Sequence, residues 1–310
     1  MFTIVIPVFN EEELIPYLVM PLKEELEKTN IAKTLLFVND GSTDRSLLKL
    51  REFFSDVKLE NTKISILSHD KNYGHMKALE TGLRHSESKF TITIDADMQD
   101  PLMLITEMIN LACSQEPQVI QTVRSLRSTD SFFKRFTANF YYKLLNKVFN
   151  IDSIPNAADC RCLRSDAKEK ILNRLNDSSV LRTLIPTLKF QTEIIYFDRQ
   201  VRKAGKTKYS MKKMADLAIN SVVGESIVPI RYMTITAMFS SLFLGITLIG
   251  ILVLRFTNAH LVSGWASLVA ILLLGFSLII FCLGIIGEYI LRIFAHLTPS
   301  ITPNLVIENL

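Results

Sequence analysis

The sequence has little that would indicate a zinc-bound or a nucleic-acid-binding protein. It contains four cysteines, and no second cysteine or histidine pair completes a zinc site with Cys160 and Cys162. The formal net charge is +4, which is too small to indicate nucleic acid as a partner. We therefore expect the cysteines to be reduced packing residues.

Charge is missing altogether from two long segments near the C-terminus. Residues 232–254 and 265–287 each run for 23 residues without an acidic or basic side chain, and a membrane-spanning helix needs about 20 such residues. Buried core helices are the alternative, although they rarely lack a polar face over so many turns. We expect two transmembrane helices, over about 232–254 and 265–290, that form a hairpin within 231–292 and leave a tail over 293–310.

A secretory signal is also missing, because Thr3–Ile6 reads as a strand and not as a basic start with a cleavage site. Basic residues precede the first charge-free run, among them Lys206, Lys208, Lys212, Lys213 and Arg231. The positive-inside rule then predicts a multi-pass protein of the inner (plasma) membrane with both termini in the cytosol. The spacing of apolar residues over 209–230 predicts an amphipathic juxtamembrane helix, or alternatively a helix packed on the domain.

Residues 1–208 alternate between apolar runs that end in turn residues and helical patterns. The expected strands are Phe2–Val8, Thr34–Asn39, Lys63–Ser68, Phe90–Ile94 and Gln118–Val123. Four helices are expected. The first two end near Thr29 and Phe54, and the other two cover Met76–His85 and Pro101–Ser114. This order predicts an α/β domain with a mainly parallel sheet and helices on both faces. Ligands of such sheets bind beyond the carboxyl ends of the strands.

The sharpest candidate site follows the fourth expected strand, in the run IDADMQDP. If the chain stayed extended there, Asp95, Asp97 and Gln99 would share one side, because side chains alternate along a strand. Two carboxylates and an amide oxygen suit Mg²⁺ or Mn²⁺, and such an ion could bridge a diphosphate. The alternative is a solvated acidic turn.

Two further runs follow the first two expected strands. They are PVFNE, from Pro7 to Glu11, and NDGSTD, from Asn39 to Asp44. Either run alone could be a turn with a helix cap. Their significance lies in their order and spacing together with the run IDADMQDP.

The runs VIPVFNEE, VNDGSTD, NYGHMKALETGL and IDADMQDP, in this order, resemble the inverting family-2 glycosyltransferases, which have the Rossmann-like glycosyltransferase A fold. Together with RQVRKAGKTKYS and the two charge-free runs, they are similar to the polyprenyl-phosphate glycosyltransferases. That branch includes dolichol-phosphate mannose synthases and bactoprenol glucosyltransferases. The resemblance covers nearly the whole chain.

The resemblance implies a role for each matching residue. The donor-binding residues would be Pro7, Phe9, Glu11, Asp40 and Asp95. The ligands of a Mg²⁺ or Mn²⁺ cofactor would be Asp95, Asp97 and Gln99, and the catalytic residues Asp97 and Asp159. The chain departs from its relatives at Cys160, Cys162, His75 and Met76, and we read His75 as structural.

An anionic acceptor needs cations near the diphosphate site. Guanidinium groups suit a phosphate because they offer paired donors. The resemblance favours Arg124 and Arg135 as ligands of the acceptor phosphate, with Arg202 and Lys208 next. The alternative is a solvated basic surface.

The sequence thus predicts inverting transfer of glucose or N-acetylglucosamine from a UDP-sugar to undecaprenyl (polyprenyl) phosphate, for modification of a cell-envelope glycan. The expected partners are the nucleotide sugar, the polyprenyl phosphate, the membrane, a second copy of the chain, a flippase and a downstream glycosyltransferase. One alternative is a GDP-mannose-dependent polyprenyl-phosphate mannose synthase. A processive polysaccharide synthase is disfavoured because these carry a Q-x-x-R-W segment, and the sole tryptophan is Trp265. The last alternative is a catalytically silent membrane-anchored scaffold.

Overall fold

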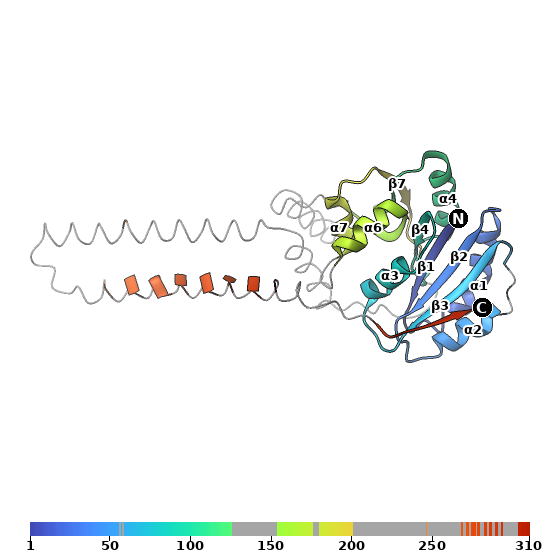
Figure 1. The fold of residues 1–310 in the computed structure, drawn as a ribbon, viewed down its shortest axis with the longest axis horizontal. Helices are drawn as coiled ribbons and strands as arrows, with labels where there is room; N and C mark the ends of the chain where they lie inside the picture. Colours follow the sequence, from blue (N-terminus) through green and yellow to red (C-terminus); the bar gives the residue numbers. More distant parts are fainter. Residues whose placement is uncertain are drawn as a thin grey trace, which may run out of the picture. The chain divides into compact units, whose positions relative to one another are not determined.

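An eight-stranded sheet forms the centre of the domain in the computed structural model (Figure 1). The structure describes residues 1–125, 154–200 and 303–310, except 56, 58 and 176–179. It also describes scattered positions from 246 to 293. The strands are β1 (Phe2–Val8), β2 (Lys33–Asn39), β3 (Thr62–His69), β4 (Phe90–Thr93), β5 (Val119–Arg124), β6 (Ala157–Arg164), β7 (Thr192–Phe197) and β8 (Leu305–Asn309). Their order across the sheet is β7-β5-β6-β4-β1-β2-β3-β8.

Most strands point the same way. Strand β1 pairs in parallel with β2 and β4, β2 with β3, and β5 with β7. Strand β6 is antiparallel to both β4 and β5, and β8 is antiparallel to β3. The carboxyl ends of the other six strands therefore meet at one edge of the sheet, where ligands of α/β proteins bind. The amino end of β6 lies at that same edge.

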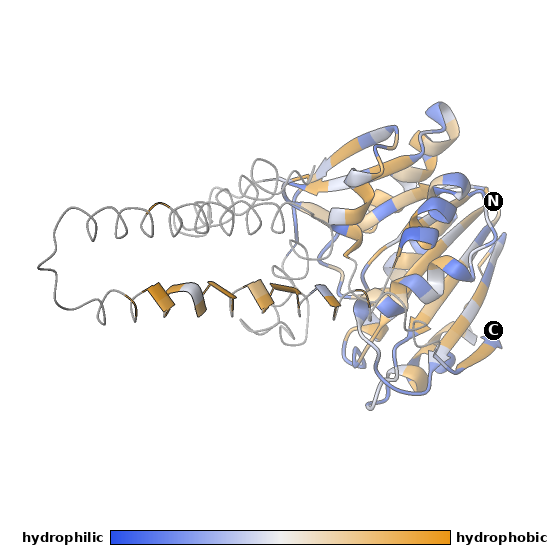
Figure 2. Cartoon of the chain, turned by 60° about the vertical axis from the view of Figure 1, so that its left-hand side comes forward, coloured by the Kyte–Doolittle hydropathy of each residue, from blue (hydrophilic) through white to orange (hydrophobic). Residues whose placement is uncertain are grey.

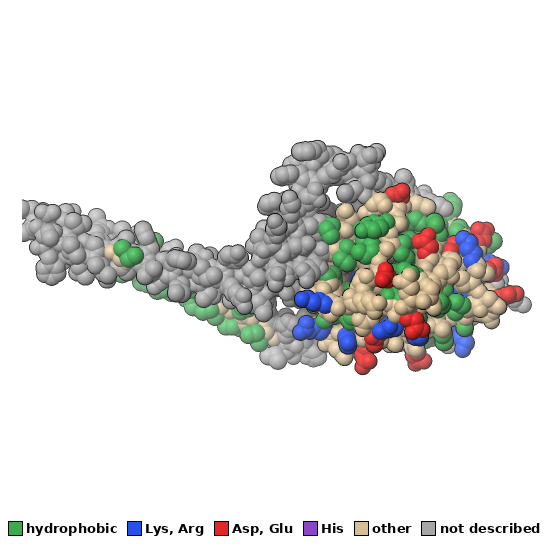
Figure 3. All heavy atoms as spheres, turned by 90° about the horizontal axis from the view of Figure 1, so that it is seen from above, with side chains coloured by type: hydrophobic (Ala, Val, Ile, Leu, Met, Phe, Trp, Pro, Cys, Tyr) green, Lys and Arg blue, Asp and Glu red, His purple; other side chains and the backbone are tan. Residues whose placement is uncertain are grey.

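Helices cover both faces of this sheet. Their bounds are α1 (Ile15–Glu27), α2 (Ser46–Ser55), α3 (His75–Arg84), α4 (Met103–Gln115), α6 (Ser165–Arg174) and α7 (Leu181–Thr187). Helices α1, α2 and α4 contribute to the largest apolar core, whereas α3, α6 and α7 pack in a second one. Figure 2 shows that the strands are mostly hydrophobic, whereas the helices carry both hydrophobic and hydrophilic residues. On the face drawn in Figure 3, acidic and basic side chains are interspersed over the described part of the domain.

The predicted α/β architecture is confirmed, and so is the order of its first nine elements. Strand β1 has the predicted bounds, and each end of β2 to β5 lies within one residue of its predicted position. Cys160 and Cys162 are buried in the larger core, as predicted for packing residues, whereas Cys113 is exposed.

The predicted localisation in a membrane is wrong, as the helices of the structure show. A spanning helix needs about 20 apolar residues, and within the described part of the chain no helix is both long enough and apolar enough to cross a bilayer. The longest of those with assigned bounds, α1 and α4, have 13 residues each. Apart from single positions, the expected spans over 232–254 and 265–290 and the expected helix over 209–230 lie outside the described residues.

The last residues of the chain form a strand where a tail was predicted. Strand β8 pairs with the outer edge of β3, and Arg51 on α2 forms two hydrogen bonds with Glu308 of β8. The side chain of Ser65 also bonds Asn309 at 2.7 Å. The C-terminus is therefore part of the same sheet as the N-terminal strand.

Candidate active site

The acidic run after β4 lies at the carboxyl edge of the sheet. The strand ends at Thr93 and the chain then turns, with Met98 in the left-handed region at φ 55°. The backbone N–H of Gln99 donates to Oδ1 of Asp97 at 3.1 Å and stabilises this turn. Asp95, Asp97 and Gln99 are half-buried and alternate with buried neighbours, but the chain turns here and does not continue the extended strand on which the prediction of a shared side depended.

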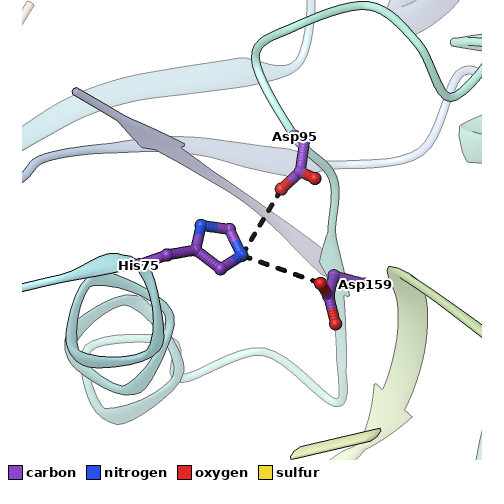
Figure 4. Close-up of side chains that lie close together, drawn as sticks. All are labelled: His75, Asp95 and Asp159. Carbon is purple, nitrogen blue, oxygen red and sulfur yellow. Dashed lines mark ion pairs between the residues drawn. The ribbon is translucent and has the colours of Figure 1, made fainter. Parts of the chain in front are cut away.

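Three side chains from separate elements meet at this edge (Figure 4). His75 is the first residue of α3, Asp95 follows β4, and Asp159 lies on β6. Nε2 of His75 is 3.6 Å from Oδ1 of Asp95 and 3.9 Å from Oδ2 of Asp159. Both distances are too long for hydrogen bonds. The ligand atoms of the three side chains lie within 4.8 Å of one another, which is close enough to hold one metal ion.

The carboxylate of Asp159 is paired with two arginines. Its Oδ1 accepts a hydrogen bond from Arg161 at 2.7 Å, and its Oδ2 accepts one from Arg182 at 3.0 Å. Burial acts to raise the pKa of Asp159, but the charges of Arg182 and Arg161 outweigh it and hold this pKa well below its usual range. The carboxylate therefore stays ionised at neutral pH.

Asp95 is in the opposite electrostatic situation. Burial raises its pKa, and the nearby charges of Asp159 and Asp97 raise it further against the opposing effect of His75 and Arg124. Carboxylates that destabilise one another's charge are a fitting donor set for a divalent cation, which would relieve that repulsion. His75, Asp95 and Asp159 thus fit a divalent metal, and of the predicted ligands Asp95, Asp97 and Gln99 only Asp95 belongs to this group.

Asp40 is buried just after β2 and organises the loop that leads into α3. Its two carboxylate oxygens accept hydrogen bonds from the backbone N–H groups of Tyr73 and Gly74, at 2.9 and 2.8 Å, and from the side chain of Asn72 at 2.9 Å. The ring of His69 lies 2.8 Å from the same carboxylate. This network positions the loop directly before His75, and the role of Asp40 in donor binding stays a prediction.

The other predicted donor-binding residues lie at the end of β1. Pro7 is buried within the strand, and Phe9 and Glu11 are half-buried beyond it. The backbone N–H of Asn10 donates to Oγ of Ser42 at 3.0 Å. The first two predicted runs are therefore neighbours at the carboxyl edge.

A basic cluster lies beside the acidic run. Arg124, at the end of β5, is 3.5 Å from Oδ1 of Asp100. Burial raises the pKa of Asp100 to about 6, against the opposing charge of Arg124. Arg199 donates to Oε1 of Gln99. The structure thus brings one predicted acceptor residue, Arg124, to the site. The other three lie outside the described residues: Arg135, Arg202 and Lys208.

Three residues of the site were not found by sequence reasoning. His75 was read as structural, and Arg161 and Arg182 were not considered. A signal for Arg161 does exist, because it follows Asp159 by two positions on one strand and alternate side chains share a face. No local pattern indicates that Arg182, from α7, reaches the same carboxylate.

Comparison with known proteins shows the family to which the chain is similar. The family described as Glycosyl transferase family 2 matches residues 3–172. The chain is 36% identical over 303 residues to the uncharacterized glycosyltransferase YkoT of Bacillus subtilis, covering 95% of this chain and 88% of that protein. It is 32% identical over 310 residues to the bactoprenol glucosyl transferase of Shigella phage SfV, covering 99% and 98%. A prophage bactoprenol glucosyl transferase homolog of Escherichia coli is 32% identical over 295 residues, covering 94% and 93%.

Proposed function

We propose a specific reaction for this chain, which belongs to glycosyl transferase family 2 because the family matches more than half of its residues. The chain is a glycosyltransferase. The proposed reaction transfers a hexosyl group, either glucose or N-acetylglucosamine, from a UDP-sugar to a polyprenyl phosphate with inversion at the anomeric carbon.

One observation carries this proposal. Carboxylates that fit a divalent cation and guanidinium groups that fit a phosphate lie at the same edge of the sheet. Transfer from a nucleotide diphosphate to a phosphate acceptor needs both, because the leaving group and the attacking group are both anions. A solvated acidic turn would not need Arg124 beside it.

The choice of acceptor and sugar is supported by the relatives. Two proteins that match this chain over more than nine-tenths of its length are named as a bactoprenol glucosyl transferase and a homolog of one. Bactoprenol is a polyprenyl lipid, and the names favour glucose over N-acetylglucosamine. Mannose from GDP-mannose is the second candidate donor.

In the proposed reaction an oxygen of the acceptor phosphate attacks the anomeric carbon. The bond from this carbon to the diphosphate breaks, and its electron pair leaves with the diphosphate. A phosphate monoester carries about −1.5 to −2 charge at neutral pH, so no strong base is needed to activate it. Asp159, whose pKa is held low, is therefore assigned to stabilising the positive charge that develops on the sugar. Asp95 and Asp97 would hold Mg²⁺ or Mn²⁺, which supplies neutralisation of the departing diphosphate.

A direct assay tests the reaction. The purified chain is incubated with undecaprenyl phosphate and, in turn, UDP-glucose, UDP-N-acetylglucosamine and GDP-mannose, and the lipid product is weighed by mass spectrometry. We expect a mass increase of one hexose with UDP-glucose. An increase with GDP-mannose alone would establish the mannose alternative, and no lipid product from any donor would refute the proposed acceptor.

Arg124 is the described residue best placed to bind the acceptor phosphate. Arg124→Lys keeps a positive charge beside Asp100 but removes the planar pair of donors. We expect the transfer rate to fall about 10- to 100-fold, because charge-assisted hydrogen bonds contribute roughly 1.5–3 kcal/mol, while UDP binding measured by calorimetry stays unchanged.

The matched control is Arg84→Lys, because Arg84 pairs with Glu80 on α3 away from the acidic run. This variant should transfer at the normal rate. Normal transfer by Arg124→Lys would instead move the acceptor phosphate to other cations. The remaining candidates would be Arg135, Arg202 and Lys208.

A further inference from the structure

The amide oxygen of Gln99 already has a partner that competes with a metal. Arg199 donates to Oε1 of Gln99, and the backbone N–H of Gln200 donates to the carbonyl oxygen of the same residue at 2.9 Å. A guanidinium carries donors and no acceptor, so the side-chain atom that faces Arg199 must be the oxygen. A cation bound to this oxygen would lie next to the positive charge of Arg199. Gln99 is therefore better suited to positioning Arg199 than to binding a metal.

The imidazole of His75 occupies the opposite situation. Its Nε2 is directed between two carboxylates (Figure 4), and neither distance is a hydrogen bond. Its side chain is 30% exposed. Asp159 already accepts hydrogen bonds from two arginines. Asp95 is therefore the carboxylate that is better able to bind a cation.

The distance between His75 and Asp95 suits two ligands of one ion. Ligands that each lie about 2.1 Å from an ion are roughly 3.0 Å apart when adjacent and 4.2 Å apart when opposite. The observed 3.6 Å between Nε2 and Oδ1 falls inside this range. An ion could therefore bind both atoms with only a small adjustment of either side chain.

We propose that His75 is a ligand of the catalytic metal together with Asp95, in place of Gln99, and that it sets the preference of this site for Mn²⁺ over Mg²⁺. Imidazole nitrogen binds transition-metal ions well, whereas Mg²⁺ prefers oxygen ligands. A site made of carboxylates alone would discriminate less between the two ions. This inference rests on the proposed metal-dependent transfer and specifies the ion on which it depends.

The test measures metal binding without any sugar transfer. Mn²⁺ is titrated into the purified full chain in the presence of UDP, and free Mn²⁺ is followed by electron paramagnetic resonance, with Mg²⁺ as a competitor. The variants are His75→Ala and Gln99→Ala, with His85→Ala as the control. His85 lies just past the other end of α3, where its ring is 2.8 Å from the carbonyl oxygen of Thr81.

We expect His75→Ala to weaken Mn²⁺ binding by at least about 10- to 100-fold. Losing a residue that only hydrogen-bonds a metal ligand already weakens metal affinity by that factor. Mg²⁺ binding should change far less, so the preference for Mn²⁺ should shrink by a similar factor. Gln99→Ala and His85→Ala should bind Mn²⁺ like the wild type. Pulsed resonance should also detect the coupling of a ring nitrogen to Mn²⁺ in the wild type and in Gln99→Ala, but not in His75→Ala.

Two results would overturn the inference and leave the proposed function standing. One is Mn²⁺ bound to the wild type without nitrogen coupling. The other is a loss of affinity in Gln99→Ala together with unchanged binding in His75→Ala, which would assign the third ligand to Gln99. If the wild type binds no Mn²⁺ in the presence of UDP, this inference is refuted, and the proposed metal dependence then requires Mg²⁺.

Discussion

Asp97→Asn is expected to abolish glycosyl transfer while the domain stays folded. The substitution removes one negative charge from the acidic run, and with it the charge of a proposed ligand for the ion that would neutralise the departing diphosphate. Losing about 4 kcal/mol of transition-state stabilisation corresponds to a rate about 10³-fold lower. The fold should persist because the asparagine oxygen can still accept the 3.1 Å hydrogen bond from the backbone of Gln99.

The measurement is the initial rate of lipid glycosylation at saturating donor, with a thermal melt for each variant. Glu107→Gln is the matched control, because it removes an equal charge from α4, outside the acidic run. The wild type should lose activity with a chelator and regain it with Mg²⁺ or Mn²⁺. Full activity of the chelated enzyme, or of Asp97→Asn, would show that no metal at this run takes part in transfer.

Gly41→Ala is expected to cause a large loss of stability. Gly41 has φ 62°, and a Cβ placed on it would lie 2.2 Å from the carbonyl carbon of Lys71 and 2.6 Å from the backbone nitrogen of Asn72. The left-handed conformation costs an alanine about 1–2 kcal/mol, and the backbone contact adds to that cost because backbone cannot rotate away. We expect the free energy of unfolding to fall by about 3 kcal/mol, which lowers the melting temperature by roughly 6–12 °C.

Gly41→Asn separates the two causes. Asparagine tolerates the left-handed region better than alanine does, but its Cβ meets the same backbone atoms. Because the contact with Lys71 dominates, we expect this variant to be no more stable than Gly41→Ala in chemical denaturation. A Gly41→Asn variant as stable as the wild type would show that conformation alone explains the glycine. Both variants should also weaken binding of the nucleotide sugar, since the displaced loop carries the backbone N–H groups that donate hydrogen bonds to Asp40.

Local patterns in the sequence were sufficient to predict the first half of the domain. Apolar runs that end in turn residues gave the positions of β1 to β5, because a strand between two helical layers must be apolar on both sides. The helices between them followed from their spacing of apolar residues. The same reasoning was wrong about localisation, where two charge-free runs were interpreted as membrane spans.

The later strands could not be predicted from such patterns. Strand β6 carries Asp159, Arg161 and Arg164 among its apolar residues, so it does not read as a buried strand. It is nevertheless buried because it inserts antiparallel between β4 and β5. Strand β8 consists of the last residues of the chain, and its partner β3 lies far away in the sequence. Pairing at such separations depends on the order of strands in the sheet and not on local periodicity.

The sequence by itself determined that acidic residues follow β4, that Asp40 follows β2, and that both lie where parallel strands end. It could do so because the direction of parallel strands fixes the edge at which their carboxyl ends meet. Only the tertiary structure decided which side chains face one another at that edge. His75 meets Asp95 and Asp159 because α3 packs on β1 and β2 and begins at this edge, and Gln99 meets Arg199 because the chain after β7 returns to the acidic run. These contacts join residues far apart in the chain, so their geometry is set by the packing of whole elements.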